Sequence, residues 1–237
     1  MDYLTIALPK GKLFSGATGK LREIGFAVEE VKEDSRRMVF VDEARGVRFL
    51  VARASDVPTF VEYGAADLGI VGKDTLLEAE QRVYELLDLG FGLCRFVVAA
   101  PRQLVDPDAA VADAAREAPS GGADVLWRDR SSVRVATKFP RVAQRHFARS
   151  GRPVEVILLH GSVELAPSVG LAQAIVDLVE TGRTLRENGL VELEEIARST
   201  ARLIGNGVAM RLKREQVEQV AERLRTGVEA IGSADPR

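Results

Sequence analysis

Several residue types that identify particular classes of protein are scarce in this sequence. Its 237 residues include one cysteine, Cys94, and two histidines, His146 and His160. One cysteine cannot form an internal disulfide or a multi-cysteine metal site, and it is typical of a protein from a reducing cytoplasm. The two histidines fall on separate predicted elements, so no histidine metal site is expected, and His146, on an arginine-rich helix, is predicted to be exposed.

Long apolar runs and a strong charge of one sign are also missing. No segment approaches the roughly 20 apolar residues of a membrane span, and Met1-Asp2-Tyr3-Leu4 lacks the basic start of a signal peptide. The formal net charge is −2, whereas general nucleic-acid-binding proteins are usually basic. We therefore expect a cytoplasmic protein in which any anion-binding site is local.

Apolar runs of strand length alternate with helical patterns along the chain. This alternation predicts an α/β fold with a largely parallel sheet. The length fits two lobes, the first at 1–94, completed by about 200–237, and the second at 95–199. Ligands bind such folds at the carboxyl ends of the strands. Strands are expected at 4–8, 38–41, 47–51, 67–72, 93–99, 133–137, 154–159, 171–176 and within 191–204.

The helices are predicted from their start signals and from one apolar stripe. Asp56, Asp74 and Ser162 are expected to act as N-caps, and Gly25 fits the end of the first helix. Residues 102–131 are rich in small and charged residues and are expected to form a loop or an insertion. The final helix, 214–231, carries a packing stripe of Val217, Val220, Ala221, Leu224, Val228 and Ile231.

The clearest chemical signal is a strand that ends in a polar, glycine-bearing turn before a short helix. Backbone N–H groups in the turn Glu180-Thr181-Gly182-Arg183-Thr184 could converge on a phosphate at the helix N-terminus. Gly182 permits close backbone approach, and Asp177 could accept hydrogen bonds from sugar hydroxyls. A solvated turn with the same residues is an equally good interpretation of the spacing alone.

Cationic residues follow two strands of the first predicted lobe. Lys10-Gly11-Lys12 precedes a helix, where lysines are unfavourable beside the helix dipole unless an anion is bound there; a solvated basic turn is the alternative. Arg53 ends a strand and could bind a pyrophosphate through its guanidinium, and Arg36 lies near another strand end. Asp67 and Gly72, which bound a further strand, are weaker binding candidates.

Seven motifs in order resemble the ATP phosphoribosyltransferases in their short form, over nearly the whole chain. Each motif is weak alone, but the set is specific. The motifs are Leu8-Pro9-Lys10-Gly11-Lys12-Leu13, Asp34-Ser35-Arg36-Arg37, Arg53-Ala54-Ser55-Asp56-Val57-Pro58, Gly64-Ala65-Ala66-Asp67-Leu68-Gly69-Ile70-Val71-Gly72, Val135-Ala136-Thr137-Lys138-Phe139-Pro140, Gly161-Ser162-Val163-Glu164-Leu165-Ala166-Pro167, and Asp177 to Leu190.

The resemblance implies a two-lobed fold like that of type II periplasmic binding proteins, without a C-terminal regulatory domain. It implies that ATP and phosphoribosyl pyrophosphate react to give N1-(5-phosphoribosyl)-ATP and pyrophosphate, the first step of histidine biosynthesis, with substrate-bound magnesium. It also implies a hetero-oligomer containing a regulatory partner similar to histidyl-tRNA synthetase, around a homodimer core. The stretch from about 114 to 132 is longer than the family pattern.

Site roles follow from this resemblance. The 5-phosphate is assigned to Thr181, Gly182, Arg183 and Thr184, and the ribose to Asp177, with Glu164 and Glu180 as further contacts. The pyrophosphate or ATP phosphates are assigned to Lys10, Arg36 and Arg53, with Lys12 a weaker candidate. Asp67 and Gly72 complete the predicted substrate-binding residues, and no protein residue is assigned to a metal.

Three other classes compete with this assignment. An anion-capturing binding protein shares the two-lobed architecture, but such proteins usually carry a signal peptide or lipid anchor. A type I phosphoribosyltransferase usually has two adjacent acidic residues where this chain has Asp177-Leu178. A catalytically silent regulatory subunit is disfavoured by the intact Lys10, Arg53 and 177–184 segment.

Overall fold

The chain forms two compact units. The computed structural model describes residues 3–105, 126–127 and 132–232, with side chains up to residue 227. One unit consists of Met1–Leu93 together with Ser199–Arg237, and the other of Cys94–Arg198. Almost all of the predicted 102–131 insertion lies outside the described residues. No helix within the described ranges is both long enough and apolar enough to cross a membrane.

The discontinuous unit contains a six-stranded sheet in the order β2-β3-β1-β4-β11-β5. β1 pairs in parallel with β3 and β4, whereas β2 and β11 run antiparallel to their neighbours. The expected parallel pairing is therefore confined to the middle of the sheet. Its elements are β1 (Leu4–Pro9), α1 (Phe14–Glu23), β2 (Val39–Asp42), β3 (Val47–Ala52), α2 (Val57–Glu62), β4 (Leu68–Gly72), α3 (Lys73–Ala79), β5 (Tyr84–Asp88), β11 (Ala201–Gly205), α9 (Ala209–Leu212) and α10 (Arg214–Gly232).

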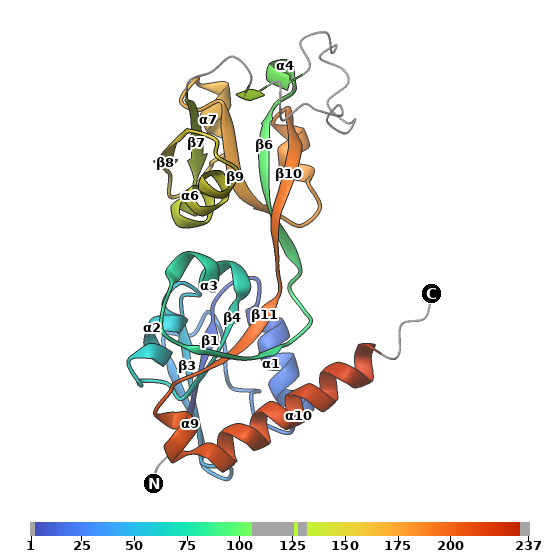
Figure 1. The fold of residues 1–237 in the computed structure, drawn as a ribbon. Coiled ribbons are helices and arrows are strands. Elements are labelled where there is room, and N and C mark those ends of the chain that lie inside the picture. Colours follow the sequence, from blue (N-terminus) through green and yellow to red (C-terminus); the bar gives the residue numbers. More distant parts are fainter. Residues whose placement is uncertain (1–2, 106–125, 128–131, 233–237) are drawn as a thin grey trace. The chain divides into compact units, whose positions relative to one another are not determined.

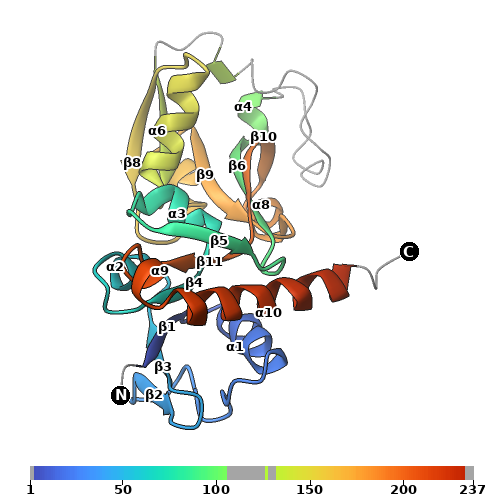
Figure 2. The same cartoon turned by 60° about the horizontal axis from the view of Figure 1, so that its bottom comes forward.

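Helices cover both faces of this sheet because successive side chains of a strand point to opposite faces. Leu4, Ile6 and Leu8 face a large apolar cluster that also contains residues of α1 and α10. Ala7 faces a smaller cluster on the other side, with residues of α2. Figures 1 and 2 show α10 lying across α1. The predicted stripe is confirmed for Val217, Val220, Ala221 and Leu224, which pack in the large cluster, whereas the side chains of Val228 and Ile231 lie outside the described part.

The second unit contains a five-stranded sheet in the order β10-β6-β9-β7-β8. β7 pairs in parallel with β8 and β9, and β6 runs antiparallel to β9. An apolar cluster on one face includes Ile175 and Val179 of β9, with Val163 and Leu185 from the segments around it. The elements are β6 (Cys94–Pro101), α4 (Arg102–Val105), β7 (Val133–Thr137), α6 (Pro140–Arg149), β8 (Val154–Leu158), α7 (Leu165–Ser168), β9 (Ala174–Val179), α8 (Arg183–Glu187) and β10 (Leu190–Ser199).

The helices α2, α3 and α7 begin close to the residues predicted as their N-caps, but the expected capping hydrogen bonds are not formed. Asp56 is at the N-cap position of α2, yet its carboxylate accepts a hydrogen bond from the Ser55 hydroxyl instead. Asp74 is in the first turn of α3, after the N-cap Gly72. Ser162 has a φ of 47° and precedes α7, whose N-cap residue is Glu164. Asp56 is thus bound by its neighbour in the chain, whereas Asp74 is bound by the distant Ser199.

His146 is also placed differently from its prediction. Its side chain is 19% exposed, and Nε2 lies 3.1 Å from a carboxylate oxygen of Glu194 on β10. Arg152 donates to the same oxygen at 2.6 Å. Burial would raise the pKa of Glu194, but hydrogen bonds from His146 and Arg152 outweigh it and lower this pKa below its usual value. The histidine therefore helps to attach α6 to an edge strand.

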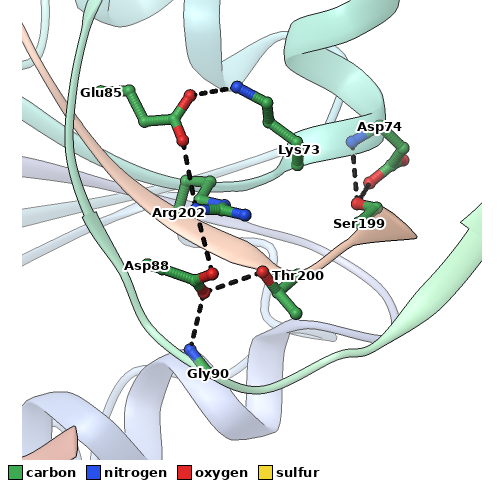
Figure 3. A network of polar contacts seen from close by, with 8 residues as sticks. All are labelled: Lys73, Asp74, Glu85, Asp88, Gly90, Ser199, Thr200 and Arg202. Carbon is green, nitrogen blue, oxygen red and sulfur yellow. Dashed lines mark hydrogen bonds and ion pairs between the residues drawn. The ribbon is translucent and has the colours of Figure 1, made fainter. Parts of the chain in front are cut away.

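A polar network fixes the segments that enter and leave the discontinuous unit (Figure 3). The carboxylate of Asp88 accepts hydrogen bonds from the Thr200 hydroxyl at 2.8 Å and from the Gly90 N–H at 3.0 Å. Arg202 lies 3.0 Å from the same carboxylate and 3.2 Å from that of Glu85. One carboxylate thus holds both chain segments that connect the two units.

Candidate active site

The carboxyl edge of the sheet in the discontinuous unit carries the predicted cations. Lys10 follows β1 and Arg53 follows β3, and these two strands are parallel neighbours. The Lys10 N–H donates to the Ala52 carbonyl at 2.7 Å, so Lys10 and Arg53 are adjacent at the edge. Lys10 is half-buried and Arg53 is exposed. Parallel pairing therefore brings two of the predicted catalytic residues together.

Arg36 reaches the same edge from the antiparallel strand β2. The Val51 N–H donates to the Met38 carbonyl at 2.9 Å, which fixes the residues just before β2 beside the end of β3. Arg36 is exposed there. Its neighbour Arg37 instead lies over the ring of Phe40, with the guanidinium carbon 5.4 Å from the ring centroid. The structure thus distinguishes a solvent-facing arginine from one that packs against the protein.

The loop after β1 presents a backbone donor as well as lysines. Gly11 has a φ of 90°, a left-handed conformation that favours glycine. Its N–H donates to the Glu33 carboxylate at 2.6 Å. Lys12 is exposed in the same loop. A carboxylate oxygen already accepts a hydrogen bond here, which is evidence that the loop geometry suits an anionic acceptor.

Gly72 ends β4 at this edge, and it is needed for space. A Cβ atom at Gly72 would lie 2.1 Å from a carboxylate oxygen of Asp74. That carboxylate accepts a hydrogen bond from the Ser199 hydroxyl, and the Asp74 N–H donates to the same hydroxyl oxygen, both at 2.8 Å (Figure 3). Sequence reasoning missed Ser199, because its partner is 125 residues away. The pair fixes the start of α3 beside the cations.

Asp67 lies away from these residues, at the opposite end of β4. Its carboxylate accepts hydrogen bonds from the Thr5 N–H at 2.8 Å and from the Lys213 amine at 2.9 Å. The side chains of Asp67 and Lys213 are only 14% and 15% exposed. The structure therefore does not bring Asp67 together with Lys10, Arg53 and Gly72, and its contacts are structural.

In the second unit, β9 carries a buried carboxylate shortly before its end. Asp177 is 8% exposed, and one of its carboxylate oxygens accepts the Leu178 N–H at 2.8 Å. On β9 it lies between Ile175 and Val179, whose side chains are on the apolar-cluster face. A carboxylate accepts hydrogen bonds from hydroxyl groups, so Asp177 is of the residue type that binds sugar hydroxyls.

The turn after β9 has the backbone geometry that the sequence suggested. Gly182 is buried, has a φ of 70° and occupies the N-cap position of α8. Glu180, Thr181 and Thr184 are exposed. The first-turn N–H groups of a helix have no acceptor within it, so this turn presents donors together with threonine hydroxyls.

Of the two arginines of α8, Arg183 is paired with a carboxylate, and Arg186 lies beside Gly182. Arg183 donates to Glu187 one helical turn later at 2.7 Å. A Cβ atom placed on Gly182 would lie 3.1 Å from both an Arg186 guanidinium nitrogen and a Glu192 carboxylate oxygen. The predicted 5-phosphate contact of Arg183 is therefore the one least favoured by the geometry.

Two further residues lie on segments that neighbour β9. Glu164 is half-buried at the N-cap position of α7, directly after Val163, which packs with Ile175 and Val179. Lys138 follows β7, the parallel neighbour of β9, and received no site role from the sequence. Its position directly after a strand is the signal that could have singled it out. The unit thus brings two carboxylates and a lysine to β9 and the segments that neighbour it.

The fold and the site residues together define a class of protein. Cations and a left-handed glycine at one sheet edge suit phosphate groups, and a buried carboxylate before a glycine turn suits a phosphorylated sugar. Both occur at carboxyl edges of parallel strands in an α/β fold, where ligands of this fold class bind. These features are those of an enzyme that handles nucleotides and sugar phosphates.

Known proteins narrow this class to one family. A family model described as HisG: ATP phosphoribosyltransferase matches residues 53–226. The ATP phosphoribosyltransferase of Desulfitobacterium hafniense (strain Y51) is 51% identical over 224 residues, which cover 94% of this chain and 96% of that protein. The enzyme of Moorella thermoacetica is 53% identical over 224 residues, covering 94% and 92%.

Solved structures agree with the sequence relatives. The ATP phosphoribosyl transferase (HisG:HisZ) complex from Thermotoga maritima includes a chain with 34% identity and a TM-score of 0.73, covering 96% of this chain and 99% of that one. The GluR0 ligand-binding core in complex with L-glutamate, at 10% identity and a TM-score of 0.52 over 96% and 93%, shares the fold alone. The predicted likeness to periplasmic binding proteins is confirmed.

The chain belongs to the ATP phosphoribosyltransferase family, as the seven motifs indicated. It is a pentosyltransferase that condenses ATP with phosphoribosyl pyrophosphate to N1-(5-phosphoribosyl)-ATP and pyrophosphate, the first step of histidine biosynthesis. The competing classes of binding protein and type I phosphoribosyltransferase are thereby set aside.

Replacement of Asp67 tests whether this residue stabilises the fold or belongs to the substrate site. Asp67→Asn leaves the partly buried Lys213 amine without its carboxylate, so we expect a loss of about 1 to 3 kcal/mol in the free energy of unfolding, measured in urea. The KM values for both substrates should stay unchanged in the folded enzyme. Asp56→Asn, at an exposed carboxylate, is the matched control and should change stability by less than about 0.5 kcal/mol. A raised KM in Asp67→Asn would indicate that this residue does belong to the substrate site.

Proposed function

We propose that residues 177–184 hold the phosphoribosyl end of phosphoribosyl pyrophosphate. The backbone N–H groups and hydroxyls from Thr181 to Thr184 bind the 5-phosphate, and Asp177 accepts hydrogen bonds from the ribose hydroxyls. The observation that carries this proposal is the succession of a buried carboxylate, a left-handed Gly182 and a helix start within one short stretch. Glu164 is the second ribose contact, and Glu180 is a weaker one because it is exposed.

The cationic edge of the other unit binds the remaining phosphates in this proposal. Lys10, Arg36 and Arg53 come from three neighbouring strands and carry charges complementary to pyrophosphate or the ATP triphosphate. Lys12, exposed in the loop after β1, is a weaker candidate, and Gly72 leaves room for the start of α3. Asp67 is left out of the proposed site because its carboxylate is bound to Thr5 and Lys213.

The reaction then needs orientation and charge stabilisation more than proton transfer. The lone pair of adenine N1 forms the new bond to C1 of the ribose, and the electron pair of the breaking C1–O bond leaves with pyrophosphate. Adenine N1 carries no proton at neutral pH, so no general base is required for this step. The enzyme contributes by holding the reactants in line and by placing cations where charge grows on the leaving group.

In this proposal, magnesium binds together with the phosphates of the substrate. Mg²⁺ prefers oxygen ligands, keeps several waters and is commonly bound through substrate phosphates and one or two carboxylates. Within the described ranges, no group of three or more histidine, cysteine, aspartate or glutamate side chains is arranged to hold a metal. Asp177 and Glu164 supply carboxylates of the kind that Mg²⁺ accepts. When bound, the ion would neutralise phosphate charge.

We also propose that the chain is cytoplasmic and works with a regulatory partner around a homodimer core. The Thermotoga maritima relative was solved as a HisG:HisZ complex. We extend this assembly to the present chain, with a partner similar to histidyl-tRNA synthetase. The single cysteine, Cys94, fits a reducing cytoplasm.

Product formation tests the function and the partner together. The chain is incubated with ATP, phosphoribosyl pyrophosphate and magnesium, with and without the partner, and the product is followed by mass spectrometry. We expect the mass of phosphoribosyl-ATP, with a higher rate when the partner is present. A chain that forms no product even with its partner would be a silent subunit, and an equal rate in both mixtures would contradict the partner's role.

Arg53→Ala tests the leaving-group site. Loss of a cation that stabilises the departing pyrophosphate should lower kcat about tenfold or more, equivalent to about 1.4 kcal/mol of transition-state stabilisation. Arg22→Ala removes the same charge from an exposed position on α1 and should leave kcat unaltered. Steady-state kinetics at saturating substrate makes the comparison, and an unchanged kcat in Arg53→Ala would remove Arg53 from the site.

Thr184→Val tests the phosphate turn. The substitution keeps the shape of the side chain but removes its hydroxyl, so phosphoribosyl pyrophosphate should bind about fivefold to tenfold more weakly. Isothermal titration calorimetry in the presence of magnesium measures the Kd. Thr226→Val, at an exposed position of α10, is the control for loss of a threonine hydroxyl. Equal affinities in all three proteins would refute the assignment of Thr184.

A further inference from the structure

Lys138 comes level with Asp177 at the carboxyl edge of the second sheet. β7 lies between β8 and β9, and its last residue, Thr137, pairs with Val176 of β9. The next residues along the two parallel strands are Lys138 and Asp177. Neighbouring strands lie about 4.8 Å apart, so a lysine side chain starts close enough to reach a ligand held by Asp177.

The position of Lys138 is fixed by the residues on either side of it. The Thr137 hydroxyl donates to the Val176 carbonyl at 2.6 Å and accepts the Phe139 N–H at 2.9 Å. Thr137 is fully buried, and the Phe139 ring packs against Phe96 with centroids 4.9 Å apart. The chain therefore makes a tight, anchored turn that leaves Lys138 exposed between two immobilised residues.

The choice of lysine at this position is unusual for this chain. Lys138 is the only lysine between Cys94 and Arg198, a stretch that contains thirteen arginines. Elsewhere, Lys20, Lys73 and Lys213 each pair with a carboxylate. Within the described residues, the Lys138 amine has no such partner. A compact ammonium on a flexible stem, rather than a planar guanidinium, is suited to a phosphate approached from several directions.

The charges near the turn at residues 180–184 suggest a role for Lys138. A carboxylate at Asp177 repels the phosphates of a sugar bound beside it, so a nearby cation is needed to offset the repulsion. Arg183 is paired with Glu187, and Arg186 lies next to Gly182 together with Glu192. Lys138 is the neighbouring cation that has no carboxylate partner within the described part of the chain.

We propose that Lys138 binds a phosphate group of phosphoribosyl pyrophosphate beside Asp177 and offsets the charge of that carboxylate. Thr137 is the positioning residue that holds it in place. The proposal rests on the assignment of residues 177–184 to the same substrate. It adds a contact from a neighbouring strand, and it makes Lys138 specific for one of the two substrates.

Binding and kinetics of Lys138→Ala test this contact. We expect the Kd for phosphoribosyl pyrophosphate, measured by calorimetry with magnesium, and the KM for that substrate to rise about tenfold or more. The KM for ATP should change less than about twofold, because ATP would not contact Lys138. Lys138→Arg keeps the charge and should recover part of the affinity. Arg149→Ala removes a positive charge from the far end of α6 and should bind like the unaltered protein.

The outcomes distinguish the role of Lys138 from the assignment of residues 177–184, on which that role rests. If Thr184→Val weakens binding and Lys138→Ala does not, the role of Lys138 is wrong and the phosphate turn stands. If neither variant changes the affinity, the turn assignment fails as well. A higher KM for ATP alone would also overturn the proposal. Thermal melting of each variant confirms that it is folded, and Thr137→Val, with Thr137→Ser as its rescue, should raise the KM for phosphoribosyl pyrophosphate without changing that for ATP.

Discussion

Parallel pairing in the middle of each sheet is the constraint on which the candidate site depends. β1 with β3 and β4, and β7 with β8 and β9, end at the same edges as their neighbours. The residues that follow these strands are therefore brought together although they are far apart in sequence. Lys10 and Arg53 meet in this way, as do Lys138 and the Asp177 segment. The antiparallel strands around them complete the sheets, and β2 adds Arg36 to an edge that the parallel strands have already formed.

The two edges differ in how they provide for charged ligands. One edge offers flexible, mostly exposed cations around a loop whose Gly11 N–H already binds a carboxylate. The other offers a buried carboxylate and a backbone turn, with Arg183 paired to an acidic side chain. A reaction that transfers a sugar between two highly charged molecules needs both kinds of surface, because one reactant must be oriented through its hydroxyls while charge accumulates on the leaving group.

The sequence was sufficient for most strands, for the glycine turn and for the positions of the cations at strand ends, but it did not predict β5 and it treated β10 and β11 as one extended stretch. These features depend on local patterns, such as apolar runs, glycine and the residue after a strand. It was insufficient where a side chain is bound by a distant one. Asp67 was grouped with the site residues because it bounds the same predicted strand as Gly72, although it lies at the amino end of that strand, and its partner Lys213 is 146 residues away. The sequence did not predict the pairing of Asp74 with Ser199 or of His146 with Glu194, because these partners are also far apart in the chain.

The place of β11 in the first sheet has a consequence for synthesis. This strand lies between β4 and β5, yet it follows the whole second unit in the chain. While the protein is being made, β4 therefore presents an unpaired edge until Ala201–Gly205 leaves the ribosome. Exposed edges of this kind pair readily with other chains. The second unit, which is continuous from Cys94 to Arg198, can be completed first, and the unit that begins the chain is the last to close.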